Sequence, residues 1–236
     1  MRWGIDGDVV LYSVAFAAKD DPISYACNSV RSALQNIMDA VGAEGAEVYL
    51  TGGDNYRHQY AMPEYPYKGN RSGDKPEHFV ELRKFMIDSL GAVVAEGEEA
   101  DDLLGIDAVQ RGHGIATIDK DLWGVPGWHY NFKRKELSEV SPEDADRFFY
   151  QQLLTGDSTD NIPGLYKMTG KKATQKVLNP IGEMTYVQEM YDYVHKVYTS
   201  ALPCYADVHD LLLGIGRLLW IRRQEGELWT PPSQPQ

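Results

Sequence analysis

Residues 92–121 read "AVVAEGEEADDLLGIDAVQRGHGIATIDKD", and the order of segments within them predicts the fold class. The apolar runs at 92–95 and 114–118 have the length and composition of buried strands, while residues 99–111 between them show helical spacing. A helix between two such strands is typical of a βαβ unit, in which both strands lie parallel in one sheet. We therefore expect an α/β protein with a mostly parallel central sheet.

The same alternation continues on both sides of this stretch. The predicted strands are residues 2–5, 47–50, 92–95 and 114–118, and the predicted helices are residues 23–41, 77–90, 99–111 and 141–154. Ser141 followed by Pro142 is a strong helix start signal. Helical segments also dominate residues 171–222. We expect helices flanking the sheet and a helical C-terminal part.

The composition favours a globular cytoplasmic protein. The chain has 236 residues and a net charge of −12, and it contains no run near the roughly 20 apolar residues that span a membrane. The N-terminus has no long apolar signal region. The two cysteines, Cys27 and Cys204, lie far apart without metal-ligand spacing, so we expect reduced thiols.

Acidic residues follow the predicted strands at the end of the sheet where sites form in open α/β folds. Asp6 follows the first strand. Asp119 and Asp121 follow the strand 114–118, and in an extended chain they would point to the same side. The full candidate set is Asp6, Glu99, Asp101, Asp102, Asp119, Asp121, Asp157 and Asp160. Taken singly, each is also compatible with a helix first turn, a cap or a loop, but together they suit Mg²⁺ or Mn²⁺.

Residues 56–76, "YRHQYAMPEYPYKGNRSGDKP", differ from the rest of the chain because they are locally basic and contain three prolines. Composition alone leaves two interpretations open, a solvated surface loop and a segment that contacts an anionic substrate.

Six motifs in a fixed order carry a resemblance to a known family. They are "IDGD", "YRHQY", "YKGNR", "EADDLLG", "TIDKDLW" and "TGDSTDNIPG", and they extend from Asp6 to about Ala173. In this order they resemble the 5′-nuclease family, which includes flap endonucleases, phage 5′–3′ exonucleases and the 5′-nuclease domain of bacterial DNA polymerase I. The chain looks like a stand-alone, phage-type member.

The resemblance implies a PIN-like fold and a domain organisation. Residues 1–155 would form the α/β catalytic core, with a helical arch at about 56–90. Residues 156–228 would form a helix-hairpin-helix-like and helical region, and residues 229–236 a flexible tail.

The resemblance also assigns roles to individual residues. The eight acids would hold two Mg²⁺ (or Mn²⁺) ions, and without them the net charge falls to −4. Lys68 and Arg71 would contact the scissile phosphate as catalytic residues. The implied DNA-binding residues are Arg57, Tyr67, Lys68, Arg71, Lys171 and Lys172, with Tyr67 stacking on a base and a K⁺ ion at the helix-hairpin-helix-like segment.

The implied activity is a metal-dependent 5′–3′ exonuclease or structure-specific flap endonuclease that leaves 5′-phosphates on DNA. The substrate would be DNA with a 5′ end, as a flap or duplex, and RNA–DNA hybrids stay open. We expect a monomer acting in DNA replication in the cytoplasm, the host cytoplasm if phage-encoded.

Two departures from the family pattern keep alternatives open. The family aspartate after the second strand is replaced here by Leu50 beside Thr51, and Asp54 lies four residues further on. Lys167 and Thr169 stand where the family has glycines. A non-cleaving DNA-binding relative is therefore one alternative. Another is a haloacid-dehalogenase-type phosphatase, in which the nucleophile would be Asp6 and the acid Asp8.

Overall fold

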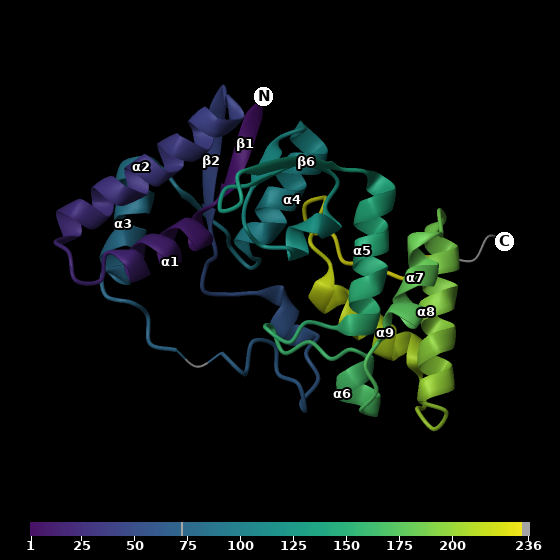
Figure 1. The fold of residues 1–236 in the computed structure, drawn as a ribbon. Coiled ribbons are helices and arrows are strands. Elements are labelled where there is room, and N and C mark those ends of the chain that lie inside the picture. The colour runs from purple at the N-terminus through teal and green to yellow at the C-terminus, as the bar shows by residue number, and fades with distance from the viewer. Residues whose placement is uncertain (72, 233–236) are drawn as a thin grey trace. The chain divides into compact units, whose positions relative to one another are not determined.

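The computed structural model describes residues 1–71 and 73–232, and the chain forms two compact units (Figure 1). The α/β unit comprises Met1–Asn55, Gly73–Val140 and Ile221–Gly226, and the helical unit comprises Tyr56–Ser72, Ser141–Trp220 and Glu227–Gln236. This division differs from the expected boundary after residue 155, because the helix that begins at Pro142 packs with the C-terminal helices.

The sheet of the α/β unit is mostly parallel, as predicted. Its strands run in the order β3-β2-β1-β4-β5-β6, and only β5 and β6 pair antiparallel. Their bounds are β1 (Arg2–Asp6), β2 (Gly45–Leu50), β3 (Val93–Val94), β4 (Gly114–Ala116), β5 (Gly127–Asn131) and β6 (Glu136–Val140). The sheet thus brings the carboxyl ends of β1 and β4 side by side.

Helices pack against the two faces of this sheet. They are α1 (Gly7–Ala17), α2 (Ile23–Val41), α3 (Phe79–Leu90) and α4 (Ala100–Arg111). Trp3 and Ile5 belong to the apolar cluster that includes residues of α1, α2 and α3. Gly4, between them, faces the other way, since a Cβ there would lie 2.7 Å from Leu104 of α4. The alternation along β1 therefore buries both faces.

The helical unit contains α5 (Pro142–Thr155), α6 (Leu165–Thr169), α7 (Gln175–Gly182), α8 (Val187–Ala201) and α9 (Val208–Leu219). The Ser141 Oγ accepts the Asp144 N–H at 3.0 Å, which confirms the predicted start of α5. Trp229, the first residue of the predicted tail, is 7% exposed and packs near Phe149 and Tyr191. The ordered chain therefore extends into the predicted tail, whose residues 233–236 lie outside the described residues.

The predicted helical arch is mostly irregular. Tyr56–Gln59 forms a single 3₁₀ turn, and among the described residues between Gln59 and Phe79 there is no helix. Three prolines account for this, because proline removes an amide donor and restricts the residue before it.

Two expectations from composition can be compared with the described residues. None of the helices there is long and apolar enough to cross a membrane. Cys27 and Cys204 are both free thiols, as predicted.

Candidate active-site residues

Asp6 lies where β1 ends and α1 begins. Its Oδ1 accepts the Val9 N–H at 3.0 Å and so caps α1, while its Oδ2 accepts the Thr117 hydroxyl at 2.7 Å. The Thr117 Oγ1 in turn accepts the Asp119 N–H at 3.0 Å. Thr117 therefore links the carboxyl ends of β1 and β4, which pair as neighbours in the sheet.

Asp101 has a strongly perturbed electrostatic environment. Burial raises the pKa of its carboxyl well above the usual range, and the negative charges of Asp6, Asp119, Glu99 and Asp102 raise it further. Burial likewise raises the pKa of Asp6 to about 6, although hydrogen bonds from Thr117 and Val9 oppose the change. These carboxylates therefore repel one another in a poorly solvated place, where a cation would stabilise their charged forms.

The donor chemistry of this carboxylate cluster, which we define as Asp6, Asp101 and Asp119, fits a hard divalent ion because every donor is an oxygen. Within residues 1–71 and 73–232, no group of three or more His, Cys, Asp or Glu side chains already has a spacing that would hold a metal ion. The fit therefore rests on donor type and on the mutual repulsion around Asp101.

Glu99 and Asp102 form the N-terminal capping box of α4. Glu99 is the N-cap, and the Asp102 Oδ2 accepts the Glu99 N–H at 3.1 Å. The Asp102 Oδ1 accepts the Arg222 N–H at 3.0 Å, and the Arg222 guanidinium pairs with Glu98 at 2.7 Å. Helix capping and Arg222 thus account for much of the acidic run. No sequence signal indicated Arg222, because it reaches the α/β unit from 120 positions along the chain.

Asp121 is placed differently from the prediction. Residues 119–121 are not extended, because the Asp121 N–H donates to the Asp119 Oδ1 at 2.9 Å and Asp121 begins a 3₁₀ turn that ends at Gly124. The expectation that both acids point to one side of an extended chain is therefore wrong. The cause is the short aspartate side chain, which bonds its own backbone two residues on.

The corner after β2, where the family aspartate is absent, is held by Thr51. Its N–H donates to the Asp8 Oδ2 at 2.9 Å, and its Oγ1 accepts the N–H of Ala100, the first residue of α4, at 3.1 Å. Leu50 is fully buried and Asp54 is exposed. The neutral Thr51 hydroxyl therefore accepts the first N–H of α4. The exposed Asp54 side chain does not take the place of the missing aspartate.

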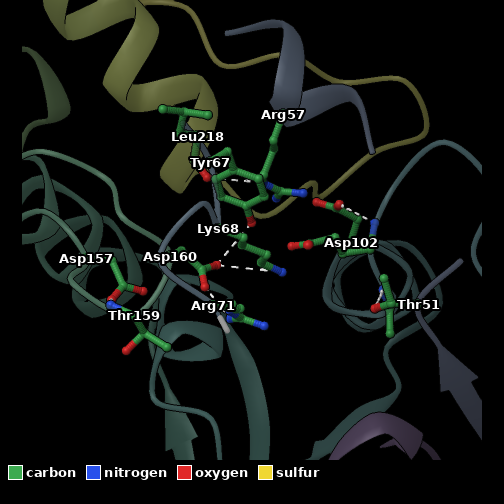
Figure 2. A network of polar contacts seen from close by, with 12 residues as sticks. Thr51, Arg57, Tyr67, Lys68, Arg71, Asp102, Asp157, Thr159, Asp160 and Leu218 are labelled. Carbon is green, nitrogen blue, oxygen red and sulfur yellow. Dashed lines mark hydrogen bonds and ion pairs between the residues drawn. The ribbon is translucent and has the colours of Figure 1, made fainter. Parts of the chain in front are cut away.

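The basic residues of the "YKGNR" motif gather on Asp160 within the helical unit (Figure 2). The Arg71 guanidinium pairs with its Oδ1, the Lys68 ammonium lies 3.7 Å from its Oδ2, and the Tyr67 hydroxyl donates to Oδ2 at 3.0 Å. The Lys68 N–H also donates to the Asp160 carbonyl at 2.8 Å. In this structure Asp160 is the counter-ion of the two expected catalytic cations.

Asp157 fixes the turn that carries Asp160. Its Oδ1 accepts the Thr159 N–H at 2.8 Å, and its backbone pairs with Ile162 in both directions. Asn161, whose φ is 62°, donates from its side chain to the Pro66 carbonyl at 3.0 Å. The turn and the basic segment therefore hold each other in place through polar contacts.

Two expected DNA contacts are buried. The Arg57 side chain is 2% exposed and donates to the carbonyls of Leu218 at 3.0 Å and Trp220 at 2.7 Å. Tyr67 is 4% exposed, with Lys68 over its ring at 5.1 Å. A stacking role for Tyr67 does not fit this arrangement, in which the ring supports Asp160 and Lys68, and Arg57 would have to leave its carbonyls to meet a phosphate.

Lys171 and Lys172 are exposed and follow the short helix α6. The Thr169 Oγ1 accepts the Lys171 N–H at 3.1 Å, and the Lys172 ammonium lies 5.7 Å from the centre of the Tyr166 ring. Thr169 thus uses a side-chain oxygen at a position where the family pattern has glycine.

Sequence comparison detects bacterial DNA polymerases. No protein-family model matches the chain. The DNA polymerase I of Deinococcus radiodurans is 29% identical over 144 residues, which cover 52% of this chain and 15% of the polymerase. The thermostable DNA polymerase I of Thermus aquaticus is 27% identical over 206 residues, which cover 76% of this chain and 24% of the polymerase. The chain therefore spans a quarter or less of the length of these relatives.

Structure comparison detects a phage nuclease fold. A structure of the bacteriophage T5 5′-exonuclease with bound zinc aligns with a TM-score of 0.69 and 19% identity, over 93% of this chain and 89% of that one. A complex of the T5 flap endonuclease with DNA and metal ions aligns with a TM-score of 0.64 and 18% identity, over 92% and 88%. The chain therefore shares its fold with these phage nucleases and has sequence similarity to part of bacterial DNA polymerase I.

Proposed function

We propose that the protein is a metal-dependent 5′-nuclease that hydrolyses DNA phosphodiester bonds and leaves 5′-phosphate ends. The observation that carries the proposal is the electrostatic setting of Asp101, a half-buried residue whose carboxyl has a pKa raised by desolvation and by the negative charges of Asp6, Asp119, Glu99 and Asp102. Such an arrangement is unfavourable without a cation, and perturbed carboxylates of this kind are typical of functional sites. The similarity to nucleases that were crystallised with metal ions and DNA supports it.

The acids of the α/β unit would hold the metal. Asp6, Asp101 and Asp119 are the first candidates for a set of two Mg²⁺ or Mn²⁺ ions, with Glu99, Asp102 and Asp121 nearby in sequence. Asp157 and Asp160, in the helical unit, are candidates on the resemblance alone. When bound, such ions supply an activated water and charge neutralisation at a phosphate. The Asp6 carboxylate is already oriented by the Thr117 hydroxyl and the Asp119 carboxylate by the Asp121 N–H, so their direction is set before an ion arrives.

Lys68 and Arg71 would bind the scissile phosphate and stabilise the charge that develops on it. In the present structure both cations contact Asp160. A phosphate would compete for the same donors, so binding of DNA would exchange one anion for another. The exposed Lys171 and Lys172 would bind phosphates further along the DNA duplex. A K⁺ ion would bind at the same segment of the chain.

The substrate would be DNA with a 5′ end, either a flap or a duplex, with RNA–DNA hybrids as a further class. We place the protein in DNA replication as a monomer, in the cytoplasm or in the host cytoplasm if it is encoded by a phage.

Cleavage of a 5′-labelled flap and a matching blunt duplex, with Mg²⁺ and with EDTA, tests the proposal. We expect metal-dependent release of short labelled products by the wild type and no cleavage by Asp119→Asn. Asp88→Asn is the matched control, because Asp88 is an exposed acid paired with Lys84 on the surface of α3. Cleavage by Asp119→Asn at the wild-type rate would show that the site is assigned wrongly.

A second candidate, a DNA-binding relative that does not cleave, is favoured by the corner after β2, where Leu50 stands at the position of the family aspartate and the neutral Thr51 hydroxyl accepts the Ala100 N–H. DNA binding by the folded wild type without turnover in Mg²⁺ or Mn²⁺ would support this alternative. Hydrolysis of small phosphomonoesters without nuclease activity would instead favour the phosphatase.

A further inference from the structure

The α/β unit contains a pocket that the proposed nuclease chemistry does not use. It has a volume of about 950 Å³ and lies between α1, α2 and the turn that joins β5 to β6. This is at the upper end of the range for small-molecule sites. The carboxylate cluster is not among its lining residues, although Ile118, which precedes Asp119, is one of them.

The walls of the pocket are apolar and partly aromatic. Val10 and Val14 of α1, Ile37 of α2, Tyr130 of β5 and Phe132 beyond it line the interior. Four of these five belong to the buried core, so they are fixed by packing on their other sides. A flat apolar or aromatic group would find preformed surfaces there.

The mouth of the pocket carries two lysines. Lys133 and Lys135 both line it and both are exposed, and in the described part of the chain neither takes part in an ion pair. Arg134, between them, pairs with Glu136 at 3.9 Å and is not part of the lining. The two lysines therefore leave a local positive charge on a protein of net charge −12.

The turn holds these lysines in a defined conformation. The Arg134 N–H donates to the Asn131 Oδ1 at 2.9 Å, and Lys135 has a φ of 58°, in the left-handed region. The one carboxylate of the lining, Asp39, accepts a hydrogen bond from Gln35 at 2.8 Å along the exposed side of α2. The charge at the mouth is thus positive, while the interior is apolar.

We propose that this pocket binds a small amphipathic anion, with its flat apolar body against Tyr130 and Phe132 and its anionic group at Lys133 and Lys135. Charge complementarity and the pocket's volume support an occupant of this chemistry, since an uncharged ligand would leave both lysines without a partner. This site is independent of metal binding and of cleavage.

Fluorescence titration with anilinonaphthalene sulfonate tests the proposal, with N-phenylnaphthylamine as the neutral probe of nearly the same shape. We expect saturable binding of both probes by the folded wild type. The double variant Lys133→Gln/Lys135→Gln should weaken binding of the sulfonate about tenfold and binding of the neutral probe less than about twofold. Arg134→Gln is the matched control and should change neither affinity by more than about twofold.

A second variant distinguishes binding of the probes in the pocket from their binding elsewhere on the protein. Ala40 is an exposed lining residue of α2, so Ala40→Trp fills the pocket with little effect on the core and should weaken both probes about tenfold. Circular dichroism and thermal melting of each variant verify the fold. Equal affinities in all these proteins, or no saturable binding by the wild type, would overturn the proposal. If Ala40→Trp were unfolded, the comparison of the lysine pair with Arg134 would still decide it.

Discussion

Asp160 and Arg71 form an ion pair, and the Lys68 ammonium shares the same carboxylate at 3.7 Å. Both cations come from the "YKGNR" motif, and the resemblance to the 5′-nuclease family implies that they bind a phosphate. In the DNA-free protein they are already gathered around an anion, the Asp160 carboxylate. The Asp160 side chain is 15% exposed, which reduces the screening of these contacts by solvent.

Replacing this carboxylate should loosen the basic segment. Asn at position 160 can still accept the Tyr67 hydroxyl, so Asp160→Asn removes mainly the charge. We expect trypsin to cleave after Lys68 and Arg71 about fivefold faster, because the segment opens more often when both cations lose their counter-ion. The control is Glu64→Gln, an exposed acid of the same segment that should leave the rate unchanged. Equal cleavage rates for Asp160→Asn and the wild type would show that the ion pairs do not restrain the segment.

Lys68 has an unusual backbone conformation that allows its charge to be tested separately from stability. Its φ is 56°, which costs an L residue about 1–2 kcal/mol and costs glycine little. We therefore expect Lys68→Gly to be at least as stable as Lys68→Ala in chemical denaturation, by up to about 1 kcal/mol. Both variants should slow single-turnover cleavage about 100-fold, because both lack the ammonium that would stabilise the phosphate. An unchanged rate in both would remove Lys68 from the chemistry.

The carboxylate cluster predicts a pH dependence for the metal-free protein. Burial raises the pKa of Asp6 to about 6, above the value near 4 of an unfolded chain, so the folded state binds the proton more tightly. The stability that this proton contributes is present below about pH 4 and is lost as the pH rises towards about 6. Thermal melts in EDTA between these values should show Asp6→Asn losing less stability than the wild type over this window.

Asp101→Asn should weaken metal binding and should stabilise the metal-free protein. The carboxyl of Asp101 is destabilised when ionised, so its replacement should raise the melting temperature of the metal-free protein at pH 8 by about 2–4 °C for each kcal/mol of repulsion relieved. Added Mg²⁺ should stabilise the wild type but have a smaller effect on the variant. Asp88→Asn is again the control. A destabilised Asp101→Asn with an unchanged response to Mg²⁺ would contradict the assignment of this residue.

Thr51 provides a test of the altered corner after β2. Thr51→Val removes the oxygen that accepts the Ala100 N–H, whereas Thr51→Ser keeps it. Loss of such a helix N-terminal contact costs about 0.5–2 kcal/mol, so we expect Val and not Ser to lower the free energy of unfolding by this amount. Similar denaturation midpoints for both variants would mean that this hydrogen bond contributes little.

The sequence predicted those strands that are marked by a short, largely apolar run between turn residues. The predicted strands at 2–5, 47–50 and 114–118 coincide closely with β1, β2 and β4, since each is an apolar run bounded by turn residues. The hairpin of β5 and β6 was not predicted. Its alternating residues include polar and charged side chains at an edge of the sheet, so no apolar run marks it.

The candidate site was predictable in its residue types but not in its contacts. Asp6 and Asp119 could be placed at one end of the sheet because parallel strands share that end. The contact of Arg222 with Asp102 could not, since it depends on a distant segment returning to the α/β unit. The burial of Tyr67 was equally hidden, because a tyrosine in a basic, proline-rich segment has the composition of an exposed loop.

The route of the chain between the units has a consequence for how the protein can be made. The α/β unit takes its last piece from Ile221–Gly226, where Ile221 joins the apolar cluster around Leu104 and Arg222 bonds Asp102. A ribosome must therefore synthesise the chain as far as Gly226 before the unit that contains the first strand is complete. Neither unit corresponds to a continuous fragment, so they cannot be separated by a single cut, and the α/β unit of a nascent chain stays without Ile221–Gly226 until Ser141–Trp220 of the helical unit has been translated.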